Sequence, residues 1–246
     1  EFKKILETKK NKELILIQGL NNKYSKASSE MKKIINDKSK FGEFIMGSCI
    51  TWGRQNLKSD KPLVDSTHDG IFFHSMGCHQ LGQLVEWIGI PEAVYCKAPN
   101  EKDLSIGVLG VERTSSGIAI LEFQNGSSFS YSATRAAHSN PYGFAARWSG
   151  SWILHGTNAD IKREGGRISI FRENNMIGDV YVDDLDVGLL NNELMQIEDF
   201  YFSITNGNKD MEKKSLDTWI LMEALNESSR QNKKIYLKEF INEFKI

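Results

Sequence analysis

The fold can be approached from residues 67–89, which read THDGIFFHSMGCHQLGQLVEWIG. A glycine turn at Gly70 and a short apolar run lead there into a helical pattern. With residues placed about 100° apart, one face of this helix is apolar, as in a helix packed on a core, and the opposite face is polar or small. The spacing predicts that His79 points away from the core contact, toward solvent or a cleft. The apolar face consists of Gly77, Leu81, Leu84, Val85 and Ile88, and the opposite face of Ser75, His79, Gly82 and Glu86.

His79 is a candidate proton carrier. An imidazole has an unperturbed pKa of about 6.5, close to the pH at which proton transfer has to work. An ordinary surface histidine is the alternative interpretation, because a spacing pattern is only a hypothesis. The two interpretations stay open at this point.

The composition is that of an ordinary globular chain. The 246 residues are 40% hydrophobic and 26% charged, which suits one large domain or one and a half. The formal net charge is −1, and no basic stripe indicates a nucleic-acid partner. No apolar run approaches the roughly 20 residues that span a bilayer. We therefore expect neither nucleic acid nor a membrane as partner.

The cysteines and acids indicate the compartment and argue against a metal. Cys49, Cys78 and Cys96 are odd in number and widely spread, which fits a reducing cytoplasm better than a disulfide framework. They lack CxxC spacing, and the acid run at residues 183–186 lacks the glycine and terminal glutamate of a calcium loop. We predict a cytoplasmic protein without a metal site. The chain starts without Met, in what reads as mid-helix, so the lack of a signal peptide carries little weight.

The first segments read as the end of a parallel α/β sheet. Residues 1–12 form a charged helical pattern, and residues 14–17, LILI, are an uninterrupted apolar run. Such a run is typical of a strand buried on both faces. A helix followed by a buried strand is the last unit of an α/β sheet whose earlier strands are not in this chain.

The remaining pattern predicts an α+β domain, with an open, mainly antiparallel sheet and helices on one face. Asn125-Gly126, a strong type I′ pair, predicts a hairpin between residues 118–123 and 127–134. Gly165-Gly166 predicts a second hairpin, between residues 152–164 and 167–172. Other strands are expected at residues 41–51, 91–97, 106–113 and 235–237, and helices at residues 25–37, 191–205 and 215–229.

Four stretches, in this order, resemble the C-terminal half of the Gfo/Idh/MocA oxidoreductases, the glucose–fructose oxidoreductase and inositol dehydrogenase family. They match the family's last Rossmann strand with its polar-aromatic turn and helix, its glycine, acid, histidine and helix signature, its Trp–Gly–Thr hairpin, and its closing helices. The stretches are LILIQGLNNKYSKASSEMKKII, DGIFFHSMGCHQLGQLVEWIG, SGSWILHGTNADIKREGGRISI and DFYFSITNGNKDMEKKSLDTWILMEALNESSRQNKKIYL.

The resemblance implies an NAD(P)-dependent oxidoreductase that acts on a hydroxyl of a sugar, polyol or related substrate. Residues 1–20 would be a remnant of the Rossmann domain that holds NAD or NADP, and residues 21–246 the C-terminal domain for substrate binding and oligomerisation. The carried-over catalytic residue is His79, which would exchange the proton of the substrate hydroxyl. This chain departs from the family: it has no GxGxxG and no Glu-Lys-Pro, and the family's two acids are Ser75 and Gly82. Ser75 would hydrogen-bond the substrate instead.

Further binding residues are expected in turns and loops. Lys23 and Tyr24 would face the cofactor and substrate by the resemblance, with an ordinary polar turn as the alternative. Trp52 followed by Arg54 and Asn56 suits a sugar ring, which needs apolar stacking and fixed donors.

The long segment between the two hairpins contains Arg135 and His138. Loops of that length in compact domains are often functional, and an arginine can fork onto a carboxylate or phosphate. A surface loop with solvated charges is the alternative interpretation for either residue.

Two functions are carried forward. In the first, this chain is the substrate half of an oxidoreductase, inactive by itself, and assembles into a homo-oligomer, a dimer or tetramer, through the open sheet. In the second, it is a non-catalytic binding or assembly module that has lost its cofactor domain, which would suit the replacement of two acids by Ser75 and Gly82.

Overall fold

The structure, a computed structural model, describes residues 2–12, 14–52, 77–98, 116–134, 150–182, 189–207 and 209–244. The helices are α1 (Phe2–Asn11), the 3-10 turn η1 (Asn21–Tyr24), α2 (Lys26–Asn36), α3 (Cys78–Trp87), α5 (Leu189–Asn206), α6 (Asp210–Gln231) and α7 (Leu237–Phe244). The strands are β1 (Phe44–Trp52), β2 (Ala93–Lys97), β3 (Ser116–Glu122), β4 (Ser128–Thr134), β5 (Ser151–Gly156), β6 (Asp160–Glu164), β7 (Arg167–Arg172), β8 (Asn175–Tyr181) and β9 (Ile235–Tyr236).

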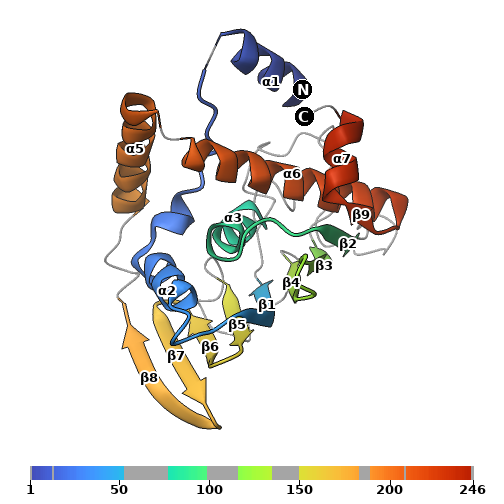
Figure 1. Ribbon diagram of the computed structural model, residues 1–246. Coiled ribbons are helices and arrows are strands. Elements are labelled where there is room, and N and C mark those ends of the chain that lie inside the picture. Colours follow the sequence, from blue (N-terminus) through green and yellow to red (C-terminus); the bar gives the residue numbers. More distant parts are fainter. Residues whose placement is uncertain are drawn as a thin grey trace, which may run out of the picture.

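In these ranges the strands form one sheet, in the order β8-β7-β6-β5-β1-β4-β3-β2-β9. Every neighbouring pair is antiparallel except β1 and β4, which run parallel and pair from Met46–Ser128 to Trp52–Thr134. Figure 1 shows α2, α3 and α6 together on one side of this sheet. The predicted α+β class, with an open and mainly antiparallel sheet, is confirmed.

Both predicted hairpins form, but each differs from its prediction. Asn125 and Gly126 lie between β3 and β4, but the turn is not the predicted type I′, which requires positive φ at both residues: Gly126 has a φ of 82°, whereas Asn125 is not among the described residues with positive φ. The Gly126 amide donates to the Phe123 carbonyl at 2.9 Å, so Gly126 follows a turn whose central residues are Gln124 and Asn125. The turn at Gly165 connects β6 to β7. The expected single arm at residues 152–164 is wrong, because the chain bends after Gly156 and makes two strands, β5 and β6. Strand β8, which sequence reasoning did not predict, follows a turn with positive φ at residues 173–174.

Helix α3 is buried on both sides, not on one. Leu81, Leu84 and Val85 lie in the core as predicted, and Trp87 packs edge-on against the fully buried Trp152 of β5, with ring centroids 4.8 Å apart. The opposite side is also covered, because Gly82 is buried close to residues of the chain before η1 and of α6. The prediction that this side faces solvent or a cleft therefore holds at most for the first turn of the helix.

Residues 14–17 do not form the predicted strand. Leu14 is 52% exposed, and the Leu16 amide donates to Glu212 Oε1 on α6 at 2.9 Å. A strand requires a neighbouring strand to share its hydrogen bonds, and none pairs with this run in the described part of the chain. The predicted strand at residues 106–113 lies outside the described residues.

Candidate functional site

His79 lies in the first turn of α3, two residues after Gly77. Its ring is partly buried, and its Nδ1 atom is buried without a hydrogen-bond partner among the residues that the structure describes. Burial lowers the pKa of His79 below its ordinary value. The imidazole is therefore neutral at neutral pH and able to accept a proton.

A buried network of hydrogen bonds fixes the backbone at His79. Gln83 Nε2 donates to the His79 carbonyl at 3.1 Å, and Gln83 Oε1 accepts from Arg163 Nη1 at 2.9 Å. Arg163, only 1% exposed, also donates to the Gly165 carbonyl at 3.0 Å. The turn between β6 and β7 thus holds the first turn of α3 through two side chains.

Sequence reasoning missed Gln83 and Arg163. A signal for Arg163 did exist. Side chains alternate between the two faces of a strand, and Arg163 lies two residues after Ile161, so both side chains point from β6 toward the core. Because a buried arginine needs several acceptors, such a position indicates a polar network in the core.

At the other end of α3, three lysines surround one carboxylate. Glu86 binds Lys32, Lys214 Nζ at 2.9 Å and Lys23 Nζ at 3.9 Å. We call these four side chains the Glu86 cluster; its lysines come from η1, α2 and α6. Burial opposes ionisation of Glu86, but the hydrogen bonds from Lys32 and Lys214 outweigh it and hold the pKa of Glu86 below its usual value. The cluster therefore ties four elements together through one charge.

The structure places Lys23 and Tyr24 in internal contacts. The Lys23 side chain is 9% exposed and faces Glu86, and burial lowers the pKa of its amine. The Tyr24 hydroxyl donates to Asp199 Oδ2 of α5 at 2.6 Å, and burial together with this bond raises the Tyr24 pKa. These contacts make η1 a junction between α3 and α5. The roles of Lys23 and Tyr24 in binding substrate or cofactor stay predictions.

Of the other candidates, the structure describes Trp52 alone. Trp52 is half-buried at the end of β1 and pairs in register with Thr134, the last residue of the parallel strand β4. Because the two strands are parallel, their C-terminal ends lie at the same end of the sheet. The Tyr131 hydroxyl of β4 donates to Gln80 Oε1 at 3.4 Å, which places the first turn of α3 over β4. The candidates Arg54, Asn56, Ser75, Arg135 and His138 lie outside the described residues.

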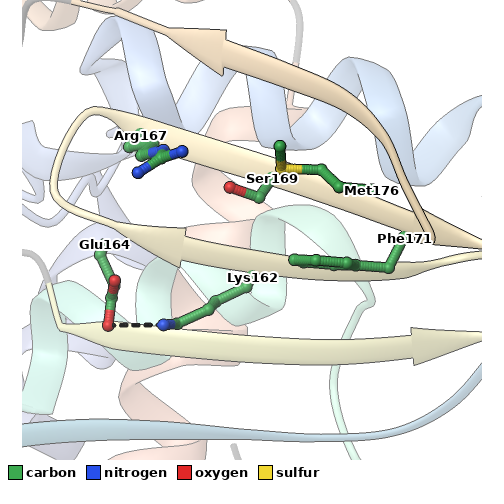
Figure 2. A pocket seen from close by; sticks show the side chains of 6 residues that line it. All are labelled: Lys162, Glu164, Arg167, Ser169, Phe171 and Met176. Atoms are coloured by element: carbon green, nitrogen blue, oxygen red, sulfur yellow. Dashed lines mark ion pairs between the residues drawn. The ribbon is translucent and has the colours of Figure 1, made fainter. Parts of the chain in front are cut away.

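A shallow hollow lies on the sheet face opposite α3. Figure 2 shows the side chains that line it, on β6, β7 and β8. Its volume of about 190 Å³ is below the roughly 300 Å³ at which small-molecule pockets begin. Its charges are already paired, Lys162 with Glu164 at 3.0 Å and Arg167 with Asp179 at 2.9 Å. We therefore do not assign the substrate to it. The lining residues are Lys162, Glu164, Arg167, Ser169, Phe171 and Met176.

Two further observations concern metal ligands and membrane-spanning helices. Across the described ranges, no three His, Cys, Asp or Glu side chains gather as metal ligands would. None of the helices described has the length and apolar character needed to cross a membrane.

Comparison with known proteins identifies the family to which the chain belongs. A family model described as the GFO/IDH/MocA C-terminal domain matches residues 29–162, more than half of the chain. Among curated protein sequences, none matches.

Solved structures resemble the whole chain in fold. An oxidoreductase from Agrobacterium radiobacter, in complex with NAD+, L-tartaric acid and magnesium, has a TM-score of 0.76 at 16% identity over 97% of this chain and 69% of its own. A putative myo-inositol dehydrogenase from Sinorhizobium meliloti 1021 has a TM-score of 0.67 at 20% identity, over 94% and 68%. Levoglucosan dehydrogenase in complex with NADH and levoglucosan has 0.69 at 16%, over 93% and 67%. At these identities the likeness supports the fold alone.

Proposed function

Since this chain belongs to the GFO/IDH/MocA oxidoreductase family, we propose that it is the substrate-binding half of an NAD(P)-dependent oxidoreductase that acts on a sugar, polyol or sugar-derivative hydroxyl. One observation carries the proposal: His79 has a neutral imidazole at the start of a firmly held helix, and its buried Nδ1 has no hydrogen-bond partner among the residues described. The solved relatives add support, since their descriptions mention NAD+ or NADH with tartaric acid or levoglucosan.

In the direction of alcohol oxidation, His79 accepts the hydroxyl proton of the substrate. The C–H bond at the same carbon breaks as a hydride, the C=O bond forms, and the imidazole becomes an imidazolium. A bound nicotinamide supplies the hydride acceptor. Gln83 and Arg163 keep the helix turn in place while the ring gains charge. In the reverse direction the same imidazolium returns the proton to the carbonyl oxygen.

The substrate-binding residues form part of the same proposal. Trp52, with Arg54 and Asn56 after it in the sequence, would stack on and hydrogen-bond the sugar, and Arg135 and His138, which follow β4 in the sequence, would add further polar contacts. Ser75 and, on η1, Lys23 and Tyr24 are also proposed to bind the substrate. Lys23 is proposed to contact the cofactor as well.

The chain has no Gly-rich phosphate turn, so the dinucleotide would be held mainly by a Rossmann domain joined to residues 1–20. The apolar run at residues 14–17, in which Leu14 is exposed and the other three residues are half-buried, supports this, because it suits a strand that pairs with such a sheet.

A non-catalytic binding or assembly module is the second candidate. A side chain at Gly82 would meet Leu20 Cδ1 at 2.7 Å, so the position of the family's second acid is closed in this chain. Without that acid and with Ser75 for the first, neither of the family's two carboxylates is available to steady an imidazolium, and Glu86 on the same face of α3 is already paired with three lysines.

We also propose a homo-oligomer through the sheet face opposite α3. Neighbouring strands align outward residues there, as in the row Tyr95, Ile120, Ser130, Ser48 and Ile153. Isoleucines at 46% and 39% exposure flank two adjacent half-buried serines in this row. A contact between two such faces would be partly polar and wet.

The test uses the polypeptide as its gene encodes it, with whatever precedes Glu1. We expect it to bind NADH or NADPH, seen as a change in nicotinamide fluorescence, and to oxidise polyols or sugars from a panel. His79→Asn should lower kcat by about 10²-fold or more, the scale of lost acid–base catalysis, while nicotinamide affinity is unchanged. No nicotinamide binding would leave the module as the function, and a near-normal rate in His79→Asn would remove this residue from the chemistry.

A further inference from the structure

Helix α5 is packed with its polar side inward. Asn192 and Ser203 are buried, Gln196 Nε2 donates to the Gln18 carbonyl at 3.1 Å, and Asp199 accepts the Tyr24 hydroxyl. These side chains recur at helical spacing and form the seam that joins α5 to the rest of the molecule. The outer side of α5 is therefore apolar. Figure 1 shows α5 at the margin of the molecule, with no labelled helix or strand on its outer side.

The outward side chains follow the pattern of a helix–helix contact. Leu194, Ile197, Tyr201 and Ile204 are 53–62% exposed and are spaced by three, four and three residues. This is the spacing of the a and d positions of a coiled coil, so the stripe fits another helix. Met195, Phe200 and Phe202 flank it and are exposed as well.

The stripe is symmetric about position 199. In an antiparallel copy, Leu194 lies opposite Ile204 and Ile197 opposite Tyr201, so the surface is complementary to itself, as an isologous contact requires. We propose that the outer face of α5 is a homotypic interface, in which α5 of a second copy of this chain packs antiparallel against it.

The composition and size of the face agree with this occupant. Aromatic side chains and methionine are enriched in interface cores and lysine is depleted there, and α5 contains no Lys. A pair of such helices buries on the order of 1,000 Å² in total, the size at which specific interfaces begin. The α5 contact is therefore weak by itself, and it adds to the proposed sheet contact instead of replacing it.

Two different isologous contacts on one chain join more than two copies. Light scattering coupled to size-exclusion chromatography, over a concentration series, should show a mass above that of a dimer, reduced two-fold by Ile197→Asp. Ile197 is 61% exposed, so this variant should keep the circular dichroism spectrum of the parent. Ile5→Asp on α1, where the isoleucine is 45% exposed, makes the same change elsewhere and should leave the mass unaltered.

Cysteine cross-linking tests the antiparallel register. Leu194→Cys mixed with Ile204→Cys should form an intermolecular disulfide, and neither variant alone should do so, because the two like positions lie about 15 Å apart along the helix pair, beyond the 7 Å reach of a disulfide. A mass that Ile197→Asp leaves unchanged, or cross-linking of each variant with itself, overturns the α5 interface. If Ile153→Asp dissolves the oligomer while Ile197→Asp leaves the mass of the parent unchanged, the sheet contact stands and the α5 contact fails. Neither outcome depends on nicotinamide binding or turnover.

Discussion

Glu86→Gln should destabilise the protein by about 2–3 kcal/mol, somewhat less than the 3–5 kcal/mol typical of breaking a fully buried ion pair. The reduction follows from the exposures of the partners. Lys32 and Lys214 are 41% and 25% exposed and can turn toward water, whereas Lys23 is 9% exposed and cannot. The main loss of stability therefore comes from leaving the buried ammonium of Lys23 without the Glu86 carboxylate.

Urea denaturation followed by circular dichroism measures this cost as a shift of the midpoint at unchanged slope. Glu43→Gln is the matched control, because its ion pair with Lys38 at 2.7 Å is exposed on both sides, and it should cost less than about 0.5 kcal/mol. Adding Lys23→Met to Glu86→Gln should recover part of the loss, since it removes the uncompensated charge. Equal losses in Glu86→Gln and Glu43→Gln, or no recovery in the double variant, would refute the reasoning.

The pH dependence gives an independent check. The folded-state pKa of Glu86 is depressed, so its carboxylate contributes stability that is fully present above the unfolded pKa of about 4.3. That contribution is lost as the pH falls through the lower folded pKa. The stability difference between the parent and Glu86→Gln should therefore be constant near neutral pH and shrink below about pH 4.3.

Other consequences follow from single contacts. The acid limb of kcat for alcohol oxidation should lie below the ordinary histidine pKa of about 6.5, because burial lowers the pKa of His79 and only its neutral form accepts a proton; a limb above that value contradicts the assignment. Tyr24→Phe should cost about 1–2 kcal/mol in urea unfolding through loss of a hydrogen bond to the Asp199 carboxylate, and no cost would mean that water replaces this bond. Gly156→Ala should lower the melting temperature and cost about 2 kcal/mol or more, since its Cβ would lie 2.2 Å from the Phe41 carbonyl oxygen, whereas Gly178→Ala meets only an ordinary contact at 3.5 Å; equal effects would contradict the close approach of the backbones at Gly156 and Phe41.

Sequence patterns predicted the features that depend on near neighbours. The Asn125-Gly126 pair predicts where a hairpin turns, and the spacing of Leu81, Leu84 and Val85 predicts a buried helix face. Both depend on a few consecutive residues, and both the place of the turn and the buried face are confirmed, although the turn is not type I′.

The features that sequence reasoning missed depend on distant contacts. The parallel pairing of β1 with β4 joins segments about 80 residues apart and leaves no local pattern. Lys32 and Lys214 lie 54 and 128 residues from Glu86 in the sequence. Taken alone, each lysine around Glu86 has the sequence pattern of an exposed charge. Residues 14–17 show the opposite failure: the local pattern of a strand is present, but the hydrogen-bonding neighbour that makes a strand is not among the described residues.

Helix α5 shows why hydrophobic periodicity does not identify what it packs against. The stripe that contains Ile197 and Tyr201 has the spacing of a core face, yet it is exposed, and the polar seam at Asp199 points inward. A periodic apolar pattern indicates a helix face suited to burial. It does not distinguish burial inside one chain from burial between two copies.

Helix α3 is held at its two ends by different parts of the molecule, and this determines how disturbances reach His79. Gln83 and Arg163 fix its first turn to the sheet, and Glu86 fixes its last turn to η1, α2 and α6. Because η1 follows residues 14–20 directly, a domain joined there would be connected to the imidazole through Lys23 and Glu86. Loosening the Glu86 end should therefore change the position of His79 relative to a bound nicotinamide more than it changes the position of Trp52, which we propose to contact the sugar. In the complete enzyme, Glu86→Gln should lower kcat while leaving KM for the sugar nearly constant, and a rise in KM at constant kcat would show that the two ends of α3 are not mechanically separate.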